Sequence, residues 1–315
     1  MASDPLFVLV ILSMAIVAIV LLTGIGGFGR GGEFNKKYAN KPKYKGIKTI
    51  LTIHNIAYQG RFSKDLMPYL DVEYGSEIEF DNLINFMKTA LVTADYVTTV
   101  SETYAKEILH DYFGYGMENV LRDRQDVLFG IVNGVDYEVF NPKTDKKIAY
   151  NYSLYNYLKG KTENKNELRD YFGLEKNDRP MIGIVSRLAN QKGFDLIGEI
   201  IEDLIYKGDM QFVLLGSGDG GIEDFYKNLQ SRYPKNVGVY IGYSDEMARK
   251  IYAGIDMFLM PSNFEPCGLA QIISLKYGTV PIVRKTGGLK DTIEIYNKYT
   301  GEGNGFGFEN YDAGD

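Results

Sequence analysis

The sequence predicts an α/β fold built on parallel sheets and preceded by one transmembrane helix. Three observations support this prediction. The second half of the chain alternates short apolar strands with helical stretches. The loops after these strands hold glycines and cations, and parallel sheets bind their ligands in such loops. The first thirty residues contain a long uncharged apolar run.

Length and composition limit the possible functions. The 315 residues are enough for two domains. The net charge of −6 argues against a nucleic-acid partner, because phosphate binding needs a basic face. One cysteine and two histidines exclude an internal disulfide, fit a reducing compartment and make a His/Cys metal site nearly impossible. We therefore expect no nucleic acid, no metal and no cofactor.

The uncharged run spans residues 5–29. As a helix it is long enough to cross a hydrocarbon layer of about 30 Å. A buried helix and a signal peptide are the alternatives, but a signal peptide starts with positive charge and the only early charge here is Asp4. Positive residues follow from Arg30 onward, which predicts a membrane anchor with the rest of the chain in the cytoplasm. If the leader is not native, the chain is expected to be cytoplasmic.

The region after this leader is predicted to contain alternating strands and helices up to about residue 150. Its elements are recognised by β-branched runs and by helical spacing of apolar residues. We expect strands at Gly46 to Ile53, Tyr96 to Val100 and Leu128 to Val132, and helices at Phe80 to Thr93 and, capped by Ser101, at Thr103 to Leu109. The polar stretch Tyr150 to Asn166 is predicted to be a linker.

The remaining residues alternate regularly between two patterns. Strands are predicted at Met181 to Val185, Gln211 to Leu215, Gly238 to Ile241, Met257 to Met260 and Val280 to Val283. Helices are predicted at Phe194 to Tyr206, Ile222 to Tyr233, Asp245 to Ala253 and Leu269 to Tyr277. This order indicates βαβ units and a mostly parallel sheet, with ligand-binding loops at the carboxyl ends of the strands.

Two cations follow the first of these strands. Arg187 and Lys192 lie five residues apart in SRLANQKG, a loop that opens a helix. Fixed cations beside a helix N-terminus form a diphosphate site. Two solvated surface charges are the plain alternative.

The strongest signal is the segment PSNFEPCGLAQIISLKYG, residues 261–278. Glu265 sits in the loop after a strand, placed to accept hydrogen bonds from sugar hydroxyls, although a capping or solvated carboxylate is the alternative. Pro266 can open the following helix. Three backbone N–H groups would then lie in its first turn and point at an anion, those of Cys267, Gly268 and Leu269.

Three weaker signals lie in neighbouring loops. RKTGGLKD (284–291) again joins a strand to a helix start, through Gly287 and Gly288. GSGDGG (216–221) permits close approach of a ligand to the backbone, but a tight turn is the simpler interpretation. Tyr243 could stack on a nucleobase or be an ordinary core or surface residue.

These motifs resemble those of bacterial glycogen synthases and plant starch synthases. SRLANQKG, GYSDE, PSNFEPCGLAQ and RKTGGLKDT are similar to the family's C-terminal domain. TIHNIAYQG, ADYVTTVSETYAKEI, YGMENVL and IVNGVDYEVFNP are similar to the second half of its N-terminal domain. The similarity runs from about Tyr44 to Asn310. It implies a GT-B-type fold with two Rossmann-like domains, a partial acceptor-side domain at 41–150 and a nucleotide-sugar-binding domain at 151–315, after an anchor and junction at 1–40.

The resemblance also implies an activity. The family transfers glucose from ADP-glucose, or from UDP-glucose in some relatives, to the non-reducing end of an α-1,4-glucan with retention of configuration. Carried onto this sequence, Arg187 and Lys192 would hold the diphosphate and Glu265 would contact the donor glucose. The implied contacts to the transferred glucose, the base and the phosphates are His54, Asn133, Tyr243, Cys267, Gly268, Leu269, Gly287 and Gly288.

Elementary chemistry agrees with this division of roles. Cations and helix N-termini can stabilise a leaving diphosphate without a metal, so the carboxylate pair of a glycoside hydrolase is not required. Retention without an obvious nucleophile suggests attack on the same face of the sugar, with the leaving phosphate helping to deprotonate the acceptor.

The residues at the two ends of the chain differ from the synthase family. Asp4 to Lys41 resembles the first span of bacterial twin-transmembrane proteins of the hypoxia-induced-gene type, and the change near Lys41 looks like a fusion junction. No Lys-x-Gly-Gly-Leu-type loop of the synthase family precedes His54, and the family continues past the last motif, so we expect truncation at both ends and a first sheet with exposed apolar faces. The chain is then either an active membrane-tethered glucosyltransferase or an inactive fragment that binds nucleotide sugar. A third hypothesis makes the anchor itself the functional part.

Overall fold

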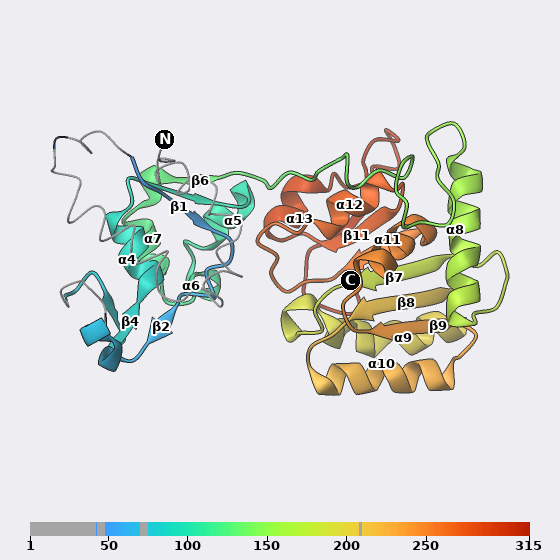
Figure 1. The fold of residues 1–315 in the computed structure, drawn as a ribbon, viewed down its shortest axis with the longest axis horizontal. Coiled ribbons are helices and arrows are strands. Elements are labelled where there is room, and N and C mark those ends of the chain that lie inside the picture. Colours follow the sequence, from blue (N-terminus) through green and yellow to red (C-terminus); the bar gives the residue numbers. More distant parts are fainter. Residues whose placement is uncertain (1–41, 43–47, 70–74, 208–209) are drawn as a thin grey trace, which may run out of the picture. The chain divides into compact units, whose positions relative to one another are not determined.

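The computed structural model describes residue 42 and residues 48–69, 75–207 and 210–315. The predicted anchor at 5–29 lies outside these residues. Within the described ranges, no helix is both long and apolar enough to cross a membrane. The chain divides into two compact units between Val132 and Asn133, and Figure 1 labels most of their helices and strands.

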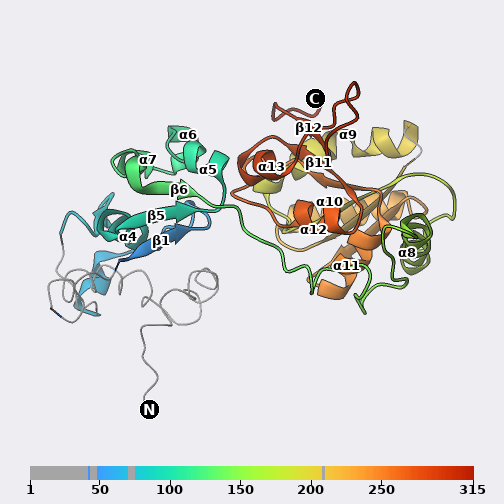
Figure 2. The ribbon, with the colours of Figure 1, turned by 90° about the horizontal axis from the view of Figure 1, so that it is seen from above.

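The first unit is built on a three-stranded parallel sheet in the order β1-β5-β6, and Figure 2 shows these strands side by side. The strands are β1 (Ile50–Ile53), β5 (Tyr96–Thr99) and β6 (Leu128–Gly130). The helices are α4 (Phe86–Thr93), α5 (Glu102–Glu107), α6 (Asp111–Gly114) and α7 (Glu118–Arg122), with 3-10 turns η3 (Lys64–Tyr69) and η4 (Gln125–Val127). The predicted N-cap is confirmed, because the Ser101 hydroxyl accepts a hydrogen bond from the Tyr104 amide at 2.8 Å.

The two faces of this sheet differ in burial. Leu51, Ile53 and Val97 point into a core with residues of α4, α5 and α7. The opposite face carries Ile50, which is 63% exposed, and Phe129, which is 49% exposed. Parallel sheets are normally covered on both faces. The exposure of Ile50 and Phe129 agrees with the exposed apolar surface expected from the sequence, but Thr52 and Thr98, which hydrogen-bond to each other at 2.9 Å, make the rest of this face polar.

The helix predicted at Phe80 to Thr93 is wrong in its first half. Residues there form a small antiparallel sheet of β2 (Arg61–Phe62), β3 (Glu79–Phe80) and β4 (Leu83–Asn85), and only then does α4 begin. Asp81 and Asn82 have φ angles of 51° and 64°, which suit a tight hairpin turn. The Asn85 side chain then caps α4 by accepting from the Lys88 amide at 2.9 Å. Local turn chemistry therefore overrides the apolar spacing.

The second unit contains the predicted parallel sheet, with six strands in the order β12-β11-β10-β7-β8-β9. Every pairing between them is parallel. The strands are β7 (Met181–Val185), β8 (Gln211–Gly216), β9 (Val237–Ile241), β10 (Met257–Met260), β11 (Val280–Arg284) and β12 (Phe306–Phe308). The five strands expected from the sequence are confirmed, and β12 is an addition at the edge.

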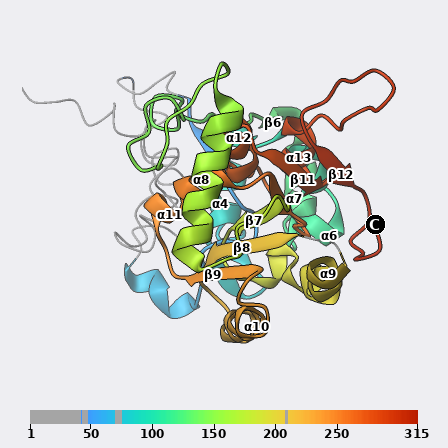
Figure 3. The same cartoon turned by 90° about the vertical axis from the view of Figure 1, so that its right-hand side faces the viewer.

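Helices cover both faces of this sheet. They are α8 (Tyr157–Phe172), α9 (Phe194–Lys207), α10 (Gly220–Arg232), α11 (Asp245–Gly254), α12 (Ala270–Lys276) and α13 (Gly287–Thr292), with a 3-10 turn η5 (Asn190–Lys192). One core lies under α9 and α10 and includes Ile184 and Tyr226. The other core, under α8, α11 and α12, includes Phe258 and Tyr277. Figure 3 shows α8 and α10 on opposite sides of the strands.

The linker predicted at Tyr150 to Asn166 is wrong, because most of it belongs to helix α8. The polar composition hides a buried residue, Asn164, which is 2% exposed. Its side-chain oxygen accepts hydrogen bonds from the amides of Ala149 and Tyr150, at 3.0 and 3.2 Å. In this helix a buried polar side chain therefore occupies a core position at which the sequence pattern leads one to expect an apolar residue.

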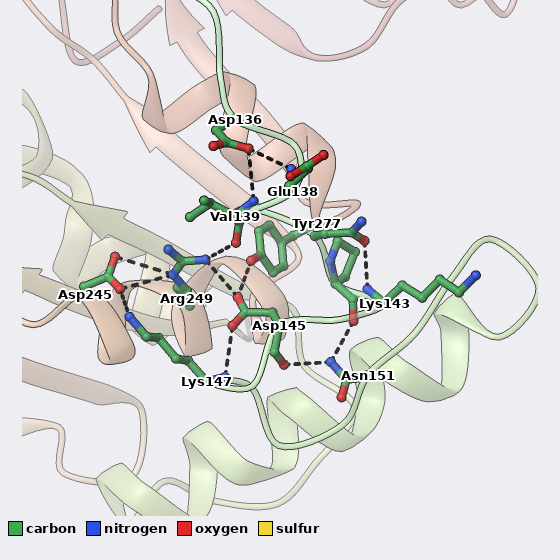
Figure 4. Close-up of polar contacts among 12 residues, drawn as sticks. Asp136, Glu138, Val139, Lys143, Asp145, Lys147, Asn151, Asp245, Arg249 and Tyr277 are labelled. Atoms are coloured by element: carbon green, nitrogen blue, oxygen red, sulfur yellow. Dashed lines mark hydrogen bonds and ion pairs between the residues drawn. The ribbon is translucent and has the colours of Figure 1, made fainter. Parts of the chain in front are cut away.

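The domain boundary expected at residue 150 also lies within the second unit, which begins at Asn133. Residues 133–151, called here the linker arm, contain no helix or strand. Side chains of the arm and of the helices bind each other closely (Figure 4). Tyr152, just after the arm, donates from its hydroxyl to the Tyr277 carbonyl oxygen at 2.7 Å. The arm therefore belongs to the second unit by its contacts.

Candidate functional site

The strand order of the second unit has its switch point at β7. The chain continues from β7 to β8 on one side of the sheet, whereas β10 lies on the other side. Loops at the carboxyl ends diverge at such a point, and open α/β sheets bind ligands there. The two loops in question are residues 186–193, after β7, and residues 261–269, after β10.

These two loops are in direct contact. The Asn263 amide donates to the Gln191 carbonyl oxygen at 2.9 Å, and the Gln191 side chain donates to the Phe264 carbonyl oxygen at 3.0 Å. Gly193 has a φ of +74°, and an added Cβ would lie 2.1 Å from the carbonyl oxygen of Pro261. Only glycine fits this approach, so the loops have a fixed relative position.

Lys192 and Glu265 meet at the junction of these loops. The Lys192 Nζ lies 2.6 Å from Glu265 Oε2, and the Ser262 hydroxyl donates to the same oxygen at 3.0 Å. The side chains of Lys192 and Glu265 are only 17% and 9% exposed. The structure therefore brings together two residues that the sequence analysis assigned to one site. Arg187 begins the same loop as Lys192 and is exposed.

The turn that follows Glu265 differs from its prediction. Helix α12 starts at Ala270 and not at Pro266, and its N-cap Leu269 makes no side-chain capping bond. Gly268 adopts a φ of +70°, which a continuous helix does not allow. The backbone groups of Cys267, Gly268 and Leu269 thus lie in a turn before the helix, where Leu269 is 42% exposed.

Gln271 holds this turn and was missed by the sequence analysis. Its side chain is fully buried, and its amide nitrogen lies 3.0 Å from the carbonyl oxygens of both Cys267 and Gly268. The same nitrogen lies 3.0 Å from the Thr292 hydroxyl oxygen on α13. A single glutamine in a helical pattern gives no sign of this role, because all three partners come from the turn and from another helix.

The second strand-to-helix turn packs directly on the first. The amide of Gly288 donates to the Glu265 carbonyl oxygen at 3.0 Å. A Cβ on Gly287 would lie 2.0 Å from that oxygen, and one on Gly288 would lie 2.2 Å from the Cys267 carbonyl oxygen. The predicted strand, glycine pair and helix start are all present. The close approach explains why both positions need glycine.

Asn133 reaches the same turn from the linker arm. Its backbone and its side chain both lie close enough to the Cys267 thiol to act on its ionisation. Burial raises the pKa of this thiol, and Asn133 acts in the opposite direction. The structure therefore gathers Asn133, Cys267 and Glu265, which the sequence analysis placed in one site.

The remaining site candidates lie on other elements, and one of them, the GSGDGG loop, contacts the loop after β7. The Leu188 amide donates to the Ser217 carbonyl oxygen at 2.9 Å, and the Asp219 amide donates to the Leu188 carbonyl oxygen at 2.7 Å. Tyr243 follows β9 and is 91% exposed. The GSGDGG loop contributes an N-cap, because Asp219 accepts from the Gly221 amide at 2.9 Å. His54 follows β1 in the first unit and is half-buried. Among the described residues, no group of three or more His, Cys, Asp or Glu side chains is arranged to hold a metal ion.

Two parts of the sequence match known protein families. Residues 33–123 match the family described as the starch synthase catalytic domain, and residues 166–315 match the glycosyl transferases of group 1. The first match begins at Glu33, well before Tyr44, so the synthase-like sequence starts earlier than the predicted junction near Lys41. Residues 1–32 lie outside both matches.

Curated relatives are similar along most of the chain. A glycogen synthase of Bacillus cereus (strain Q1) is 48% identical over 290 residues. A glycogen synthase of Clostridium perfringens (strain 13 / Type A) is 51% identical over 286 residues. Each alignment covers 89% of this chain, but only 60% and 59% of the relatives. The chain thus spans less than two thirds of their length.

Solved structures agree with the fold. The catalytic domain of starch synthase IV from Arabidopsis thaliana, bound to ADP and acarbose, matches with a TM-score of 0.83 at 31% identity. The match covers 95% of this chain and 66% of that one. Anabaena HepE in complex with UDP-glucose matches with a TM-score of 0.51 at 17% identity, which shows the fold alone. The chain is therefore built from glycosyltransferase domains of the GT-B type.

Proposed function

We propose that the chain is part of a retaining glucosyltransferase that moves glucose from ADP-glucose to the non-reducing end of an α-1,4-glucan. The observation that carries this proposal is the meeting of Lys192 and Glu265 across the switch point of the sheet, at 2.6 Å. The similarity to glycogen synthases over 89% of the chain supports it. The ADP bound to the matching starch synthase favours ADP-glucose over UDP-glucose.

The residues of the second unit divide the chemistry between them. Lys192 and Arg187 hold the diphosphate and stabilise the charge that develops on it as the glycosidic bond breaks. Glu265, held by Ser262, accepts hydrogen bonds from the hydroxyls of the donor glucose. The turn from Cys267 to Leu269 presents backbone groups to the sugar and phosphates. The glycine pair at 287–288 completes this part of the site by supporting the turn, since the Gly288 amide binds the Glu265 carbonyl oxygen.

Three further residues complete the proposed assignments. Tyr243 lies against the base, and its exposed ring is free of the core. Asn133 contacts the transferred glucose from its place beside Cys267. His54 contributes from the first unit, and its role rests on the sequence resemblance. Attack by the acceptor occurs on the face that the diphosphate leaves, so a covalent glucosyl-enzyme is not formed.

A transfer assay tests this function. Radiolabelled ADP-glucose and glycogen are incubated with the full chain and with Arg187→Ala. Label in glycogen with the wild-type chain, and its loss in the variant, is the expected result. A trapped covalent glucosyl-enzyme would contradict the proposed stereochemical course.

A second candidate function is donor binding without turnover. It is favoured by one fact, that the chain spans only 60% of the length of its curated relatives. In that case ADP-glucose binds in calorimetry and Arg187→Ala weakens binding, but no label enters glycogen. The assay and the calorimetry together separate the two functions.

We further propose that residues 5–29 anchor the chain in a membrane, with the glycosyltransferase part on the cytoplasmic side. The support is the uncharged apolar sequence and the positive residues that follow it. Fractionation of cells with and without residues 1–32 tests this. Recovery of the full chain in the soluble fraction, as for the shortened chain, would contradict the anchor.

A further inference from the structure

The linker arm is held to the second unit by a buried ion pair. Asp145 and Arg249 are 7% and 5% exposed. The Arg249 Nη1 lies 3.3 Å from Asp145 Oδ2 and also donates to the carbonyl oxygen of Val139, on the arm. The Tyr277 hydroxyl donates to the same Asp145 oxygen. Figure 4 shows the Arg249 guanidinium between the arm and Asp245.

Asp245 and Lys147 extend this ion pair into a network of four charged residues. The Arg249 Nε donates to Asp245 Oδ2 at 3.2 Å, and Lys147 of the arm binds the same carboxylate. The Arg249 guanidinium also lies 4.3 Å from the centre of the Phe140 ring. Arg249 therefore contacts the arm at three points and has a carboxylate on either side.

The arm also secures its own path. The Asn151 side chain donates to the carbonyl oxygens of Pro142 and Asp145, at 3.0 and 2.7 Å. At the other end, the Lys276 ammonium of α12 lies 4.5 Å from the centre of the Tyr137 ring. The arm is thus fixed from residue 137 to residue 151 without any regular structure of its own.

Stability alone is a weak reason for such an arrangement. Well-packed apolar residues in place of a buried ion pair often leave a protein equally stable or more so, because desolvation of the charges is costly. A buried charge pair does select one conformation against others, because any shift leaves a charge unpaired. What this pair fixes is the course of the arm, and the arm begins at Asn133, on the Cys267 thiol.

We propose that Arg249 and Asp145 are positioning residues for the donor turn. They hold the linker arm so that Asn133 stays against Cys267 and the turn from Glu265 to Gly268 keeps its shape. The assignment of this turn to the donor sugar rests on the proposed function, but the mechanical connection does not. Neither Arg249 nor Asp145 belongs to the proposed set of donor-binding residues.

The single cysteine of the chain provides the test. Cys267 is 5% exposed, so a thiol reagent such as DTNB labels it only when the turn opens. The full chain is compared with Arg249→Met, Asp145→Asn and Asn133→Ala. We expect labelling at least about tenfold faster in all three variants, since each one releases the contact at the start of the arm.

Lys165→Met is the matched control. Lys165 pairs with Asp256 at 2.5 Å in the same unit, but neither residue lies on the arm. This variant is expected to lose stability and to keep the wild-type labelling rate. If Arg249→Met fails to fold, Asp145→Asn and Asn133→Ala decide the question, since Asp145→Asn leaves Arg249 paired with Asp245 and Asn133 is only half-buried.

The outcomes separate this inference from the proposed function. Wild-type labelling rates in folded Asp145→Asn would overturn the inference, as would equal acceleration in Lys165→Met. Protection of wild-type Cys267 by ADP-glucose, and weaker protection in Asp145→Asn, supports the donor role of the turn as well. Faster labelling without any protection by ADP-glucose supports the mechanical connection and contradicts the donor assignment.

Discussion

Lys192 and Glu265 form an ion pair in the structure, with 2.6 Å between the ammonium nitrogen and the carboxylate oxygen. In the proposed mechanism these two groups bind different parts of the donor, the diphosphate and the glucose. A donor that enters the site must therefore replace this ion pair with two separate contacts. Hydrogen bonds from the glucose hydroxyls must then replace the contact that the Glu265 carboxylate loses with Lys192.

This relationship predicts opposite effects of one substitution on two ligands. In Glu265→Gln, Lys192 loses its paired carboxylate and is more available to phosphate, so ADP should bind as tightly as before or up to about tenfold more tightly. ADP-glucose should lose affinity relative to ADP, because an amide is a poorer acceptor for sugar hydroxyls than a carboxylate. Titration calorimetry with both ligands measures the difference.

Lys192→Met is the partner variant for this measurement. It removes the phosphate contact and leaves the Glu265 carboxylate buried without its cation, so both ligands should bind at least about tenfold more weakly. An equal loss of ADP and ADP-glucose affinity in Glu265→Gln would show that the carboxylate acts only on the shape of the loop.

A second prediction concerns the buried amide of Gln271. In Gln271→Leu, the carbonyl oxygens of Cys267 and Gly268 lose the side-chain donor that lies 3.0 Å from each. Buried acceptors left unsatisfied cost about 1–3 kcal/mol, so the free energy of unfolding should fall by that amount. Affinity for ADP-glucose should fall as well, because the turn beside Glu265 is no longer fixed.

Thr292→Val is the control for Gln271. It removes the hydroxyl that links the Gln271 side chain to α13 at 3.0 Å, but it leaves the donor to both turn carbonyls in place. Urea unfolding and calorimetry should therefore show a smaller effect on both quantities. Equal effects of the two variants would locate the important contact between the helices and not in the turn.

A third prediction uses the close packing of the two turns. A Cβ at Gly288 would lie 2.2 Å from the Cys267 carbonyl oxygen, so Gly288→Ala must push the turn after β11 away from the turn after β10. We expect lower stability and at least about tenfold weaker ADP-glucose binding. Thermal unfolding and calorimetry measure these two effects.

Gly220→Ala provides a matched control in the same unit. Gly220 begins α10, and an added Cβ there meets nothing within 4 Å. Alanine is the better helix former by about 1 kcal/mol, so this variant should be as stable as the wild type or more stable, with unchanged ligand binding. A loss of binding in Gly220→Ala equal to that in Gly288→Ala would contradict the steric explanation.

The sequence predicted the regular parts of the second unit because its strands and helices repeat one pattern. β7 has the predicted bounds. Gly193 and Gly288 lie in predicted loops, where the backbone comes very close to that of a neighbouring loop. The errors occur where tertiary contacts decide. The first part of α8 was predicted to be a linker because its residues, Asn164 among them, are polar. The Asn164 side chain is buried all the same, through contacts that the local sequence does not show.

The candidate site shows the same limit at the level of single residues. Lys192 and Glu265 were predicted because each follows a strand of a parallel sheet, and such loops converge at one edge. The helix predicted at Leu269 to Tyr277 agrees with α12 to within one residue at each end. The suggestion that Pro266 opens this helix is wrong, because the positive φ of Gly268 is a property of the folded turn that the sequence does not show. Gln271 and Arg249 could not be found, since each also binds a residue that is distant in sequence, Thr292 for Gln271 and Asp145 for Arg249.

A final prediction concerns Lys161 of α8, a half-buried residue. Burial lowers the pKa of Lys161 from 10.5 to about 7, against the attraction of Asp256 and with the repulsion of Lys165. Because the unfolded chain keeps its proton up to pH 10.5, it binds more protons than the folded chain above pH 7. The free energy of unfolding should therefore rise with pH between about 7 and 9, by up to about 1.4 kcal/mol per pH unit.

Lys161→Met removes this dependence by removing the titrating group. Its stability should exceed that of the wild type most at pH 6.5 and least at pH 9, although loss of the 2.5 Å contact to the Thr279 hydroxyl oxygen reduces the gain. Lys176→Met, which breaks an exposed pair with Asp170, should keep the wild-type slope. Urea unfolding of the three chains across this range measures the slopes, and parallel curves for the wild type and Lys161→Met would show that Lys161 remains charged when folded.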